Sequence, residues 1–276
     1  MSLTVANWNA MNGLDSPDRL RTCIAAVTAL DAQVTVLPEA FAEDRMAHLP
    51  LALDRIQALG YRAVMAPYED ADDRKDRHGM AVLIKGALAD ITVERFGDRN
   101  SIVGKIYDAL SSQFVSFVAL HLDDRTEVAR LKQVDDAIGW LRQSDGAKLA
   151  IGDLNSLHFA NPRARLLRLL RPLPRLLPDG QPIFGQKTPT LGRIGSLGRR
   201  ATGMATGAVL ETFEAAGFTD ADPKQTPTYT FGNRPLLQLD HILTSNCKAT
   251  AFTRSPKPKG FDHFPIRAKI ISLPNR

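Results

Sequence analysis

Cysteine, aromatic side chains and long apolar runs are all scarce in this sequence of 276 residues. Two cysteines, Cys23 and Cys247, are too few for a disulfide framework or a cysteine-rich zinc site. No apolar run approaches the ~18 residues that a membrane span needs, and the first residues lack the basic and apolar regions of a secretory signal. These absences predict a soluble, cytoplasmic protein without a transmembrane segment.

Positive charge is modest overall and concentrated in one segment. The formal net charge is +5. Residues 156–204 contain eight arginines, one lysine and one aspartate, so the net charge of this segment is +8 and that of the rest of the chain is −3. Only Phe159 and Phe184 are aromatic there, which argues against a base-stacking platform and favours recognition of anionic groups. We therefore expect an Arg-rich insertion at about 156–204.

Apolar spacing divides the chain into helices and strands. Apolar residues three and four apart predict helices near residues 20–30, 49–59, 128–141 and 208–216. Alternating or short apolar runs predict strands at Leu3–Trp8, Gln33–Leu37, Arg62–Ala66, Gly79–Ile84, Ile91–Phe96, Ile102–Tyr107, Phe114–His121, Lys148–Asp153, near Tyr229, Leu237–Leu243 and Ile266–Ile271. Several strands follow one another without a helix, which favours antiparallel pairing. The pattern predicts an α/β protein of two packed sheets with helices outside, in a single domain of residues 1–276.

Polar residues recur where these predicted strands end. Short motifs lie there in the order Trp8-Asn9, Glu39, His121-Leu122, Gly152-Asp153-Leu154-Asn155, Leu239-Asp240-His241-Ile242-Leu243 and Asp262-His263-Phe264-Pro265. Side chains two apart on a strand share a face, so Asp153 and Asn155 should point the same way. Carboxylate and amide oxygens beside imidazoles are the groups that a Mg²⁺ site with nearby proton transfer requires.

These six motifs, in this order from Thr4 to Ile271, resemble the endonuclease/exonuclease/phosphatase superfamily of apurinic endonucleases, DNases, sphingomyelinases and inositol polyphosphate phosphatases. The resemblance implies a four-layer α/β sandwich with two mixed, largely antiparallel sheets packed face to face. It also implies a divalent-metal site at one end of the two sheets, for Mg²⁺ or Mn²⁺.

The resemblance also assigns roles to individual residues. The metal set is Glu39, Asn9 and Asp262. The implied catalytic residues are Asp153 and Asn155 at the attacking water and the phosphate, the pair Asp240 and His263, and the strand-end His121. Two positions depart from the family pattern: Met11 stands where many nucleases carry an acid, and Pro38 precedes the glutamate. The number of metal ions, one or two, therefore stays open, as does the choice between Asp153 and the Asp240–His263 pair as base.

Three further histidines and the basic segment need separate interpretation. His241 should face away from Asp240 and be structural, whereas His78 and His158 match nothing firmly. The basic segment starts directly after Asn155, so its arginines leave from the predicted catalytic edge. Arg163, Arg168 and Arg171 are therefore the predicted substrate-binding residues, although a solvated surface helix explains the same pattern.

The sequence thus predicts a monomeric metal-dependent phosphoesterase that hydrolyses phosphodiester bonds by in-line attack of water. A nuclease acting on nucleic acid in endo or exo mode is the first interpretation. A phospholipid or sphingomyelin phosphodiesterase and a small-molecule phosphatase are alternatives within the same superfamily. A non-catalytic nucleic-acid-binding module is the alternative of another class, and it predicts salt-dependent binding without turnover.

Overall fold

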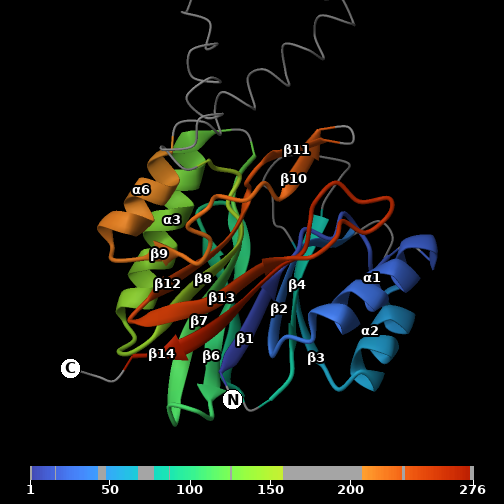
Figure 1. Ribbon diagram of the computed structural model, residues 1–276, viewed down its shortest axis with the longest axis horizontal. Coiled ribbons are helices and arrows are strands. Elements are labelled where there is room, and N and C mark those ends of the chain that lie inside the picture. The colour runs from blue at the N-terminus through green and yellow to red at the C-terminus, as the bar shows by residue number, and fades with distance from the viewer. Residues whose placement is uncertain are drawn as a thin grey trace, which may run out of the picture.

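A computed structural model describes residues 2–15, 17–42, 48–67, 78–86, 88–124, 126–157, 207–231 and 234–273. The predicted Arg-rich insertion lies outside these residues, apart from Ser156 and Leu157. The described residues form two six-stranded sheets that pack face to face (Figure 1). In this part of the chain no helix combines the length and the apolar character needed to cross a bilayer.

Each sheet contains six strands, and a small hairpin lies beside them. The first sheet has the order β13 (Cys247–Arg254), β14 (Ile266–Ser272), β1 (Leu3–Asn7), β2 (Val34–Ala42), β4 (His78–Ile84) and β3 (Arg62–Ala66). The second has the order β5 (Leu88–Phe96), β6 (Arg99–Asp108), β7 (Gln113–His121), β8 (Lys148–Asp153), β12 (Asp240–Ser245) and β9 (Thr219–Asp220). The hairpin pairs β10 (Tyr229–Phe231) with β11 (Arg234–Leu237).

Helices cover the two outer faces and complete the four layers (Figure 1). On the first sheet lie α1 (Pro17–Leu30) and α2 (Leu49–Ala58), and on the second lie α3 (Glu127–Arg142) and α6 (Ala208–Ala215). Leu20, Cys23 and Val27 form the buried stripe of α1, as their spacing predicts. Thr126 begins α3 by accepting a hydrogen bond from the Ala129 amide. The predicted four-layer α/β sandwich is confirmed.

The core between the sheets consists of the inward face of each strand. Leu3 and Val5 of β1 lie in the same buried cluster as Phe117 of β7 and Ile151 of β8. In β4, Val82 and its alternate neighbours face this core, while the intervening residues, such as Leu83, pack under α1 and α2. Burial on both faces explains why β4 is a continuous apolar run rather than an alternating one.

Two of the strand pairs are parallel, and both are closed by a helix. β1 pairs parallel with β2 across α1, and β7 pairs parallel with β8 across α3. A helix is the usual crossover between parallel neighbours, because the chain must return along the whole strand length. In each pair the carboxyl ends of the two strands therefore lie next to each other, at the same end of the sheet.

Several strands differ from the sequence-based expectations. The strand predicted to end at Leu37 continues to Ala42 beyond a shift in register, and the strand predicted at Leu237–Leu243 is split between β11 and β12. The edge strand β13 was not predicted, because its pairing with β14 buries few of its side chains. Its mixture of small and polar residues consequently lacks an apolar period.

Gly152 provides a test of the contact between β7 and β8. A Cβ atom at this position would lie 1.8 Å from the carbonyl oxygen of Leu120, its register partner. We expect Gly152→Ala to lower the free energy of unfolding by more than about 3 kcal/mol, because two backbones must move apart. Gly139→Ala is the control: this exposed residue of α3 has open space at Cβ, so alanine should add about 1 kcal/mol. Equal free energies of unfolding for Gly152→Ala and the wild-type protein, measured by urea denaturation, would contradict the close approach of β7 and β8.

Candidate active site

Strand ends from both sheets converge at one end of the sandwich. Asn9 follows β1, Glu39 lies in β2, and His121 and Asp153 end β7 and β8. Because both strand pairs are parallel, each presents its two carboxyl ends at a common edge. β12 runs antiparallel to β8 and begins at Asp240, the register partner of Asp153. The topology therefore brings together residues that are far apart in sequence.

A β-bulge presents Glu39. The register between β2 and β4 shifts between Leu37 and Phe41, and Glu39 in the bulge has φ +48°. A non-glycine residue in this left-handed region costs about 1–3 kcal/mol, and such residues persist only where surrounding contacts hold them. The Asn12 amide supplies one such contact by donating to the Glu39 carbonyl at 2.6 Å. The site thus includes a backbone conformation that local propensity does not favour.

Asn9 joins the two carboxylates at the centre of the site. Its Nδ2 donates to Glu39 Oε1 at 3.0 Å and to Asp153 Oδ2 at 3.1 Å. Its Oδ1 accepts from the Met11 amide at 3.1 Å, which fixes the orientation of the side chain. Since Asn9 follows a strand of the first sheet and Asp153 ends a strand of the second, this amide connects the two sheets.

Asp153 is a buried carboxyl group, with 2% of its surface exposed. Its Oδ1 accepts a hydrogen bond from the Asn155 amide at 3.0 Å. Burial and the nearby Asp240 carboxylate raise the pKa of Asp153 from 3.8 to about 7, against the opposing effects of His263 and Asn9. A carboxyl group that ionises near neutral pH has the basicity that suits a general base.

His263 and Asp240 form a buried pair. His263 Nδ1 lies 2.6 Å from Asp240 Oδ2, and Asn7 Nδ2 donates to Asp240 Oδ1 at 2.9 Å. Burial alone would lower the pKa of His263, but Asp240 outweighs it and, with Asp153, raises the pKa to about 10. The ring is therefore an imidazolium at neutral pH, and its Nε2 lies 3.9 Å from Asp153 Oδ2.

His121 also lies beside Asp153 and has the opposite electrostatic character to His263. Its Nε2 is 3.7 Å from Glu39 Oε1 and 4.0 Å from Asp153 Oδ2. Burial, and next the positive charge of Arg99, lower the pKa of His121 well below 6.5. Arg99 Nη1 also donates to the His121 carbonyl at 3.2 Å. A neutral and a charged imidazole thus flank one carboxyl group.

Asn155 and Asp262 lie at the margin of this cluster. Asn155 has φ +46°, and its Nδ2 donates to the Leu122 carbonyl at 2.9 Å, so its side chain ties the end of β8 to the end of β7. The carbonyl of Asp262 accepts from the Thr230 amide at 2.8 Å. Its Oδ1 is buried and has no hydrogen-bond partner among the described residues.

The donor set fits a hard cation. One ligand atom each from Asp153, Asp240 and His263 lie within 4.8 Å of one another, an arrangement that can hold a metal ion. Asp262 precedes His263 in the chain, and its Oδ1 is buried without a hydrogen-bond partner among the described residues; a carboxylate oxygen is the type of ligand that Mg²⁺ and Mn²⁺ prefer. In Asp240, however, both oxygens accept hydrogen bonds, from Asn7 and His263, so this carboxylate serves the histidine. His263, as an imidazolium, has no free lone pair for a metal ion, which leaves carboxylate and amide oxygens as the ligands.

The remaining sequence-based assignments are four residues outside the described ranges and two further histidines. Outside the described residues lie Arg163, Arg168, Arg171 and His158. His78 Nδ1 contacts Asn12 Oδ1 at 2.8 Å, which places it beside the loop that follows β1. His241 is fully buried and contacts Asp220 rather than the catalytic cluster, as strand alternation predicts.

The structure adds three residues that the sequence did not single out. Asn7 holds Asp240, Arg99 holds the end of β7, and the Tyr229 ring packs edge-on against the His263 ring at 5.0 Å between centroids. Asn7 precedes Asn9 by two residues, so a shared strand face was a usable signal. Arg99 and Tyr229 act through long-range contacts, for which neither spacing nor residue type provides a pattern.

Fold and site together define a class of protein. Two packed sheets flanked by helices, with clustered carboxylates and an aspartate–histidine pair at one end, are the arrangement of a family of phosphate-ester hydrolases. The chain belongs to the Endonuclease/Exonuclease/phosphatase family, whose sequence model matches residues 6–267. Members of this family are phosphoesterases and are generally divalent-metal dependent. No curated protein matches the sequence.

Solved structures share the fold at low sequence identity. An endonuclease/exonuclease/phosphatase from Beutenbergia cavernae is 15% identical with a TM-score of 0.65, over 99% of this chain and 72% of the other. A 3' phosphatase from Neisseria bound to a product DNA hairpin is 13% identical with a TM-score of 0.61, over 98% and 100%. A mannosyl-6-phosphatase from Bacteroides thetaiotaomicron is 14% identical with a TM-score of 0.56, over 98% and 100%.

The Asp240–His263 pair predicts how stability depends on pH. Because the folded state raises the pKa of His263 from 6.5 to about 10, the pair stabilises the fold fully below pH 6.5 and loses this effect as the pH rises towards 10. We expect the free energy of unfolding to fall by a few kcal/mol over this range, measured by urea denaturation at each pH. Asp240→Asn should flatten this dependence, whereas Asp54→Asn on an exposed face of α2 should keep it. An unchanged slope in Asp240→Asn would show that the pair is not the cause.

Proposed function

We propose that this protein is a divalent-metal-dependent phosphodiesterase that cleaves its substrate by in-line attack of water, with nucleic acid as the first substrate class. The observation that supports it is the setting of Asp153. This carboxyl group, whose pKa is near neutral, lies within 4.0 Å of Asn9, His121 and His263. A buried base between a neutral and a charged imidazole is suited to moving a proton while negative charge is stabilised.

Glu39 and Asp262 are the proposed metal carboxylates, with Asn9 completing the set. Asn9 keeps Glu39 beside Asp153 through its two hydrogen bonds, and the unpartnered Oδ1 of Asp262 provides another oxygen. A Mg²⁺ or Mn²⁺ ion held there supplies neutralisation of charge on the phosphoryl oxygens. The number of metal ions stays open, because Met11 occupies the position where many family members carry an acid.

Asp153 and His263 have complementary proposed roles. Asp153 orients a water molecule and takes its proton as the new P–O bond forms and the ester P–O bond breaks. His263, kept as an imidazolium by Asp240, donates a hydrogen bond from Nε2 to a phosphoryl oxygen, where charge develops. The high pKa of His263 argues against its acting as the base, so the structure favours Asp153 for that role.

His121 and Asn155 complete the proposed machinery. Because His121 is neutral, it is suited to a hydrogen bond with the leaving oxygen rather than to transfer of an imidazolium proton. The departing alkoxide then takes its proton from solvent. Asn155 contributes by tying the end of β8 to Leu122, which keeps Asp153 next to His121.

A phosphomonoesterase is the second candidate. Two neighbours in fold, the Neisseria 3' phosphatase and the Bacteroides thetaiotaomicron mannosyl-6-phosphatase, remove phosphate groups. The same catalytic groups serve either ester, because water attacks phosphorus in both. A panel of DNA, RNA, abasic DNA, sphingomyelin, inositol phosphates and sugar phosphates under one set of metal conditions distinguishes these substrate classes.

The first activity test uses bis-p-nitrophenyl phosphate and plasmid DNA with Mg²⁺ or Mn²⁺ and with EDTA. We expect turnover with either metal and none with EDTA. Glu39→Gln and His263→Ala should each lower kcat/KM by at least about 100-fold, because each removes a group that acts on the reacting phosphate. The matched control is Glu211→Gln, which neutralises an exposed acid on α6 and should leave the rate unchanged. Full activity in EDTA or in either site variant would contradict the proposal.

The Arg-rich segment is tested by charge reversal. We propose that Arg163, Arg168 and Arg171 bind phosphates of an anionic polymer, since the basic segment that contains them begins directly after Asn155. Changing all three to Glu should raise KM for DNA about tenfold at low salt, with a smaller effect at high salt, and leave kcat unchanged.

A matched control makes the same change in net charge elsewhere. Exposed arginines on the first-sheet side of the molecule include Arg21, Arg55 and Arg62. Reversing these three to Glu should leave KM for DNA near its original value. If both triple variants raise KM equally, the effect is general electrostatics and the segment has no specific role in binding.

A further inference from the structure

His241 lies behind the catalytic residues on the same strand. β12 begins with Asp240 and His241, and consecutive side chains of a strand point to opposite faces. Asp240 therefore contacts His263 in the site, whereas His241 points away from it and is fully buried. A buried histidine this close to the site, with no place in the proposed chemistry, needs a separate explanation.

The two ring nitrogens of His241 face two hydrogen-bond acceptors. Nδ1 lies 2.7 Å from Asp220 Oδ2, and Nε2 lies 3.2 Å from the Ser156 carbonyl oxygen. A carboxylate and a carbonyl only accept, so both nitrogens must donate and the ring is an imidazolium. Burial alone would lower the pKa of His241, but Asp220 and Ser156 outweigh it and raise the pKa above 6.5.

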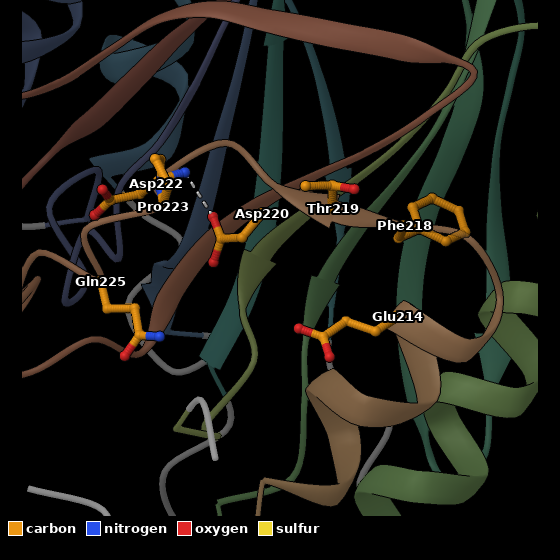
Figure 2. A pocket seen from close by; sticks show the side chains of 7 residues that line it. All are labelled: Glu214, Phe218, Thr219, Asp220, Asp222, Pro223 and Gln225. Carbon is orange, nitrogen blue, oxygen red and sulfur yellow. Dashed lines mark hydrogen bonds between the residues drawn. The ribbon is translucent and has the colours of Figure 1, made fainter. Parts of the chain in front are cut away.

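Asp220 is itself fixed as an acceptor. Its Oδ1 accepts from the Asp222 amide at 2.9 Å, and its Oδ2 accepts from Gln238 Nε2 at 3.3 Å as well as from His241. Figure 2 shows the bond from Asp222, with Asp220 and Asp222 lining a surface pocket of about 450 Å³. The carboxylate thus anchors the ring from the edge of the sheet.

Ser156 lies where the chain leaves β8. We call residues 153–157 the 153–157 turn. This turn carries Asp153 and Asn155, and Asn155 has the unfavourable φ of +46°. On one side the Leu154 amide donates to the Leu239 carbonyl at 2.9 Å. On the other side the Ser156 carbonyl accepts from His241, so two contacts from the segment around β12 hold the turn.

We propose that His241 is a positioning residue, which holds the 153–157 turn by donating to the Ser156 carbonyl while Asp220 holds its ring. The inference rests on the proposed function, in which Asp153 and Asn155 act on the substrate. Loss of the Ser156 contact frees one end of the turn. The backbone of Asn155 can then change from its positive φ to the more common negative φ. Displacement of Asp153 by about 1 Å is enough to cost up to about 100-fold in rate.

Two amide substitutions separate this role from a general contribution to stability. The amide nitrogen of Asn takes the place of the imidazole Nδ1, and that of Gln takes the place of Nε2. His241→Asn therefore keeps a donor towards Asp220 and loses the donor towards Ser156. His241→Gln does the reverse, and both variants replace the buried ring by a smaller neutral group.

We expect His241→Asn to lower kcat about 10- to 100-fold with KM unchanged, and His241→Gln to recover most of the lost rate. Hydrogen exchange at the amides of Leu154 and Asn155 should speed up in His241→Asn and stay slow in His241→Gln. Urea denaturation of both variants measures the shared loss of stability. If the two variants lose the same kcat and the same exchange protection, the positioning role is overturned.

The exchange measurement also separates this inference from the proposed function. Suppose the wild-type protein has no phosphoesterase activity, but hydrogen exchange at Leu154 and Asn155 is faster in His241→Asn than in His241→Gln. This result would refute the proposed function and support the positioning role of His241. An active wild type with equal exchange rates and equal kcat in the two variants would support the proposed function and refute the positioning role.

Discussion

Hydrogen bonds between the two sheets are the constraint on which the site depends. Over most of the sandwich the sheets meet through apolar side chains, but at one end Asn9 donates to Asp153 and Asn7 donates to Asp240. Burial makes an unpaired carboxylate costly, so these amides allow two acids to lie between packed sheets. The same burial shifts the pKa of Asp153 upwards, which gives it the basicity for proton transfer.

The chain topology determines which residues meet there. Two parallel pairs, each closed by a helix, bring the carboxyl ends of β1, β2, β7 and β8 to one end of the molecule. β12 and β14 run antiparallel to these strands, so the beginning of β12 and the loop before β14 arrive at the same end. Asp240 and His263 therefore come from chain segments that start where the other four strands stop. Residues separated by more than 200 positions become neighbours through this arrangement alone, as Asn7 and Asp240 show.

The surroundings of His263 and His121 shift their pKa values in opposite directions. His263 has a carboxylate at Nδ1 and stays protonated although its ring is buried, whereas burial and then the nearby Arg99 lower the pKa of His121 and keep it neutral. His241 repeats the aspartate–histidine arrangement on the opposite face of β12, away from His263. One strand thus carries a carboxylate that faces the candidate site and, next to it, an imidazole that faces the supporting structure. Identical residue types take different roles because their partners differ.

The sequence by itself determined the fold class and most helices and strands, and it singled out candidate residues that the structure brings together at one end of the sandwich. Apolar spacing is a local property, so the stripe of α1 and the strand that ends at Asp153 were predicted correctly. It did not determine the bulge that presents Glu39, the strand β13, or the contacts of Arg99 and Tyr229. These depend on register and on packing between distant segments, which residue order along the chain does not encode locally. The tertiary structure alone decided that His263 is charged, that His121 is neutral, and that Asp153 titrates near pH 7.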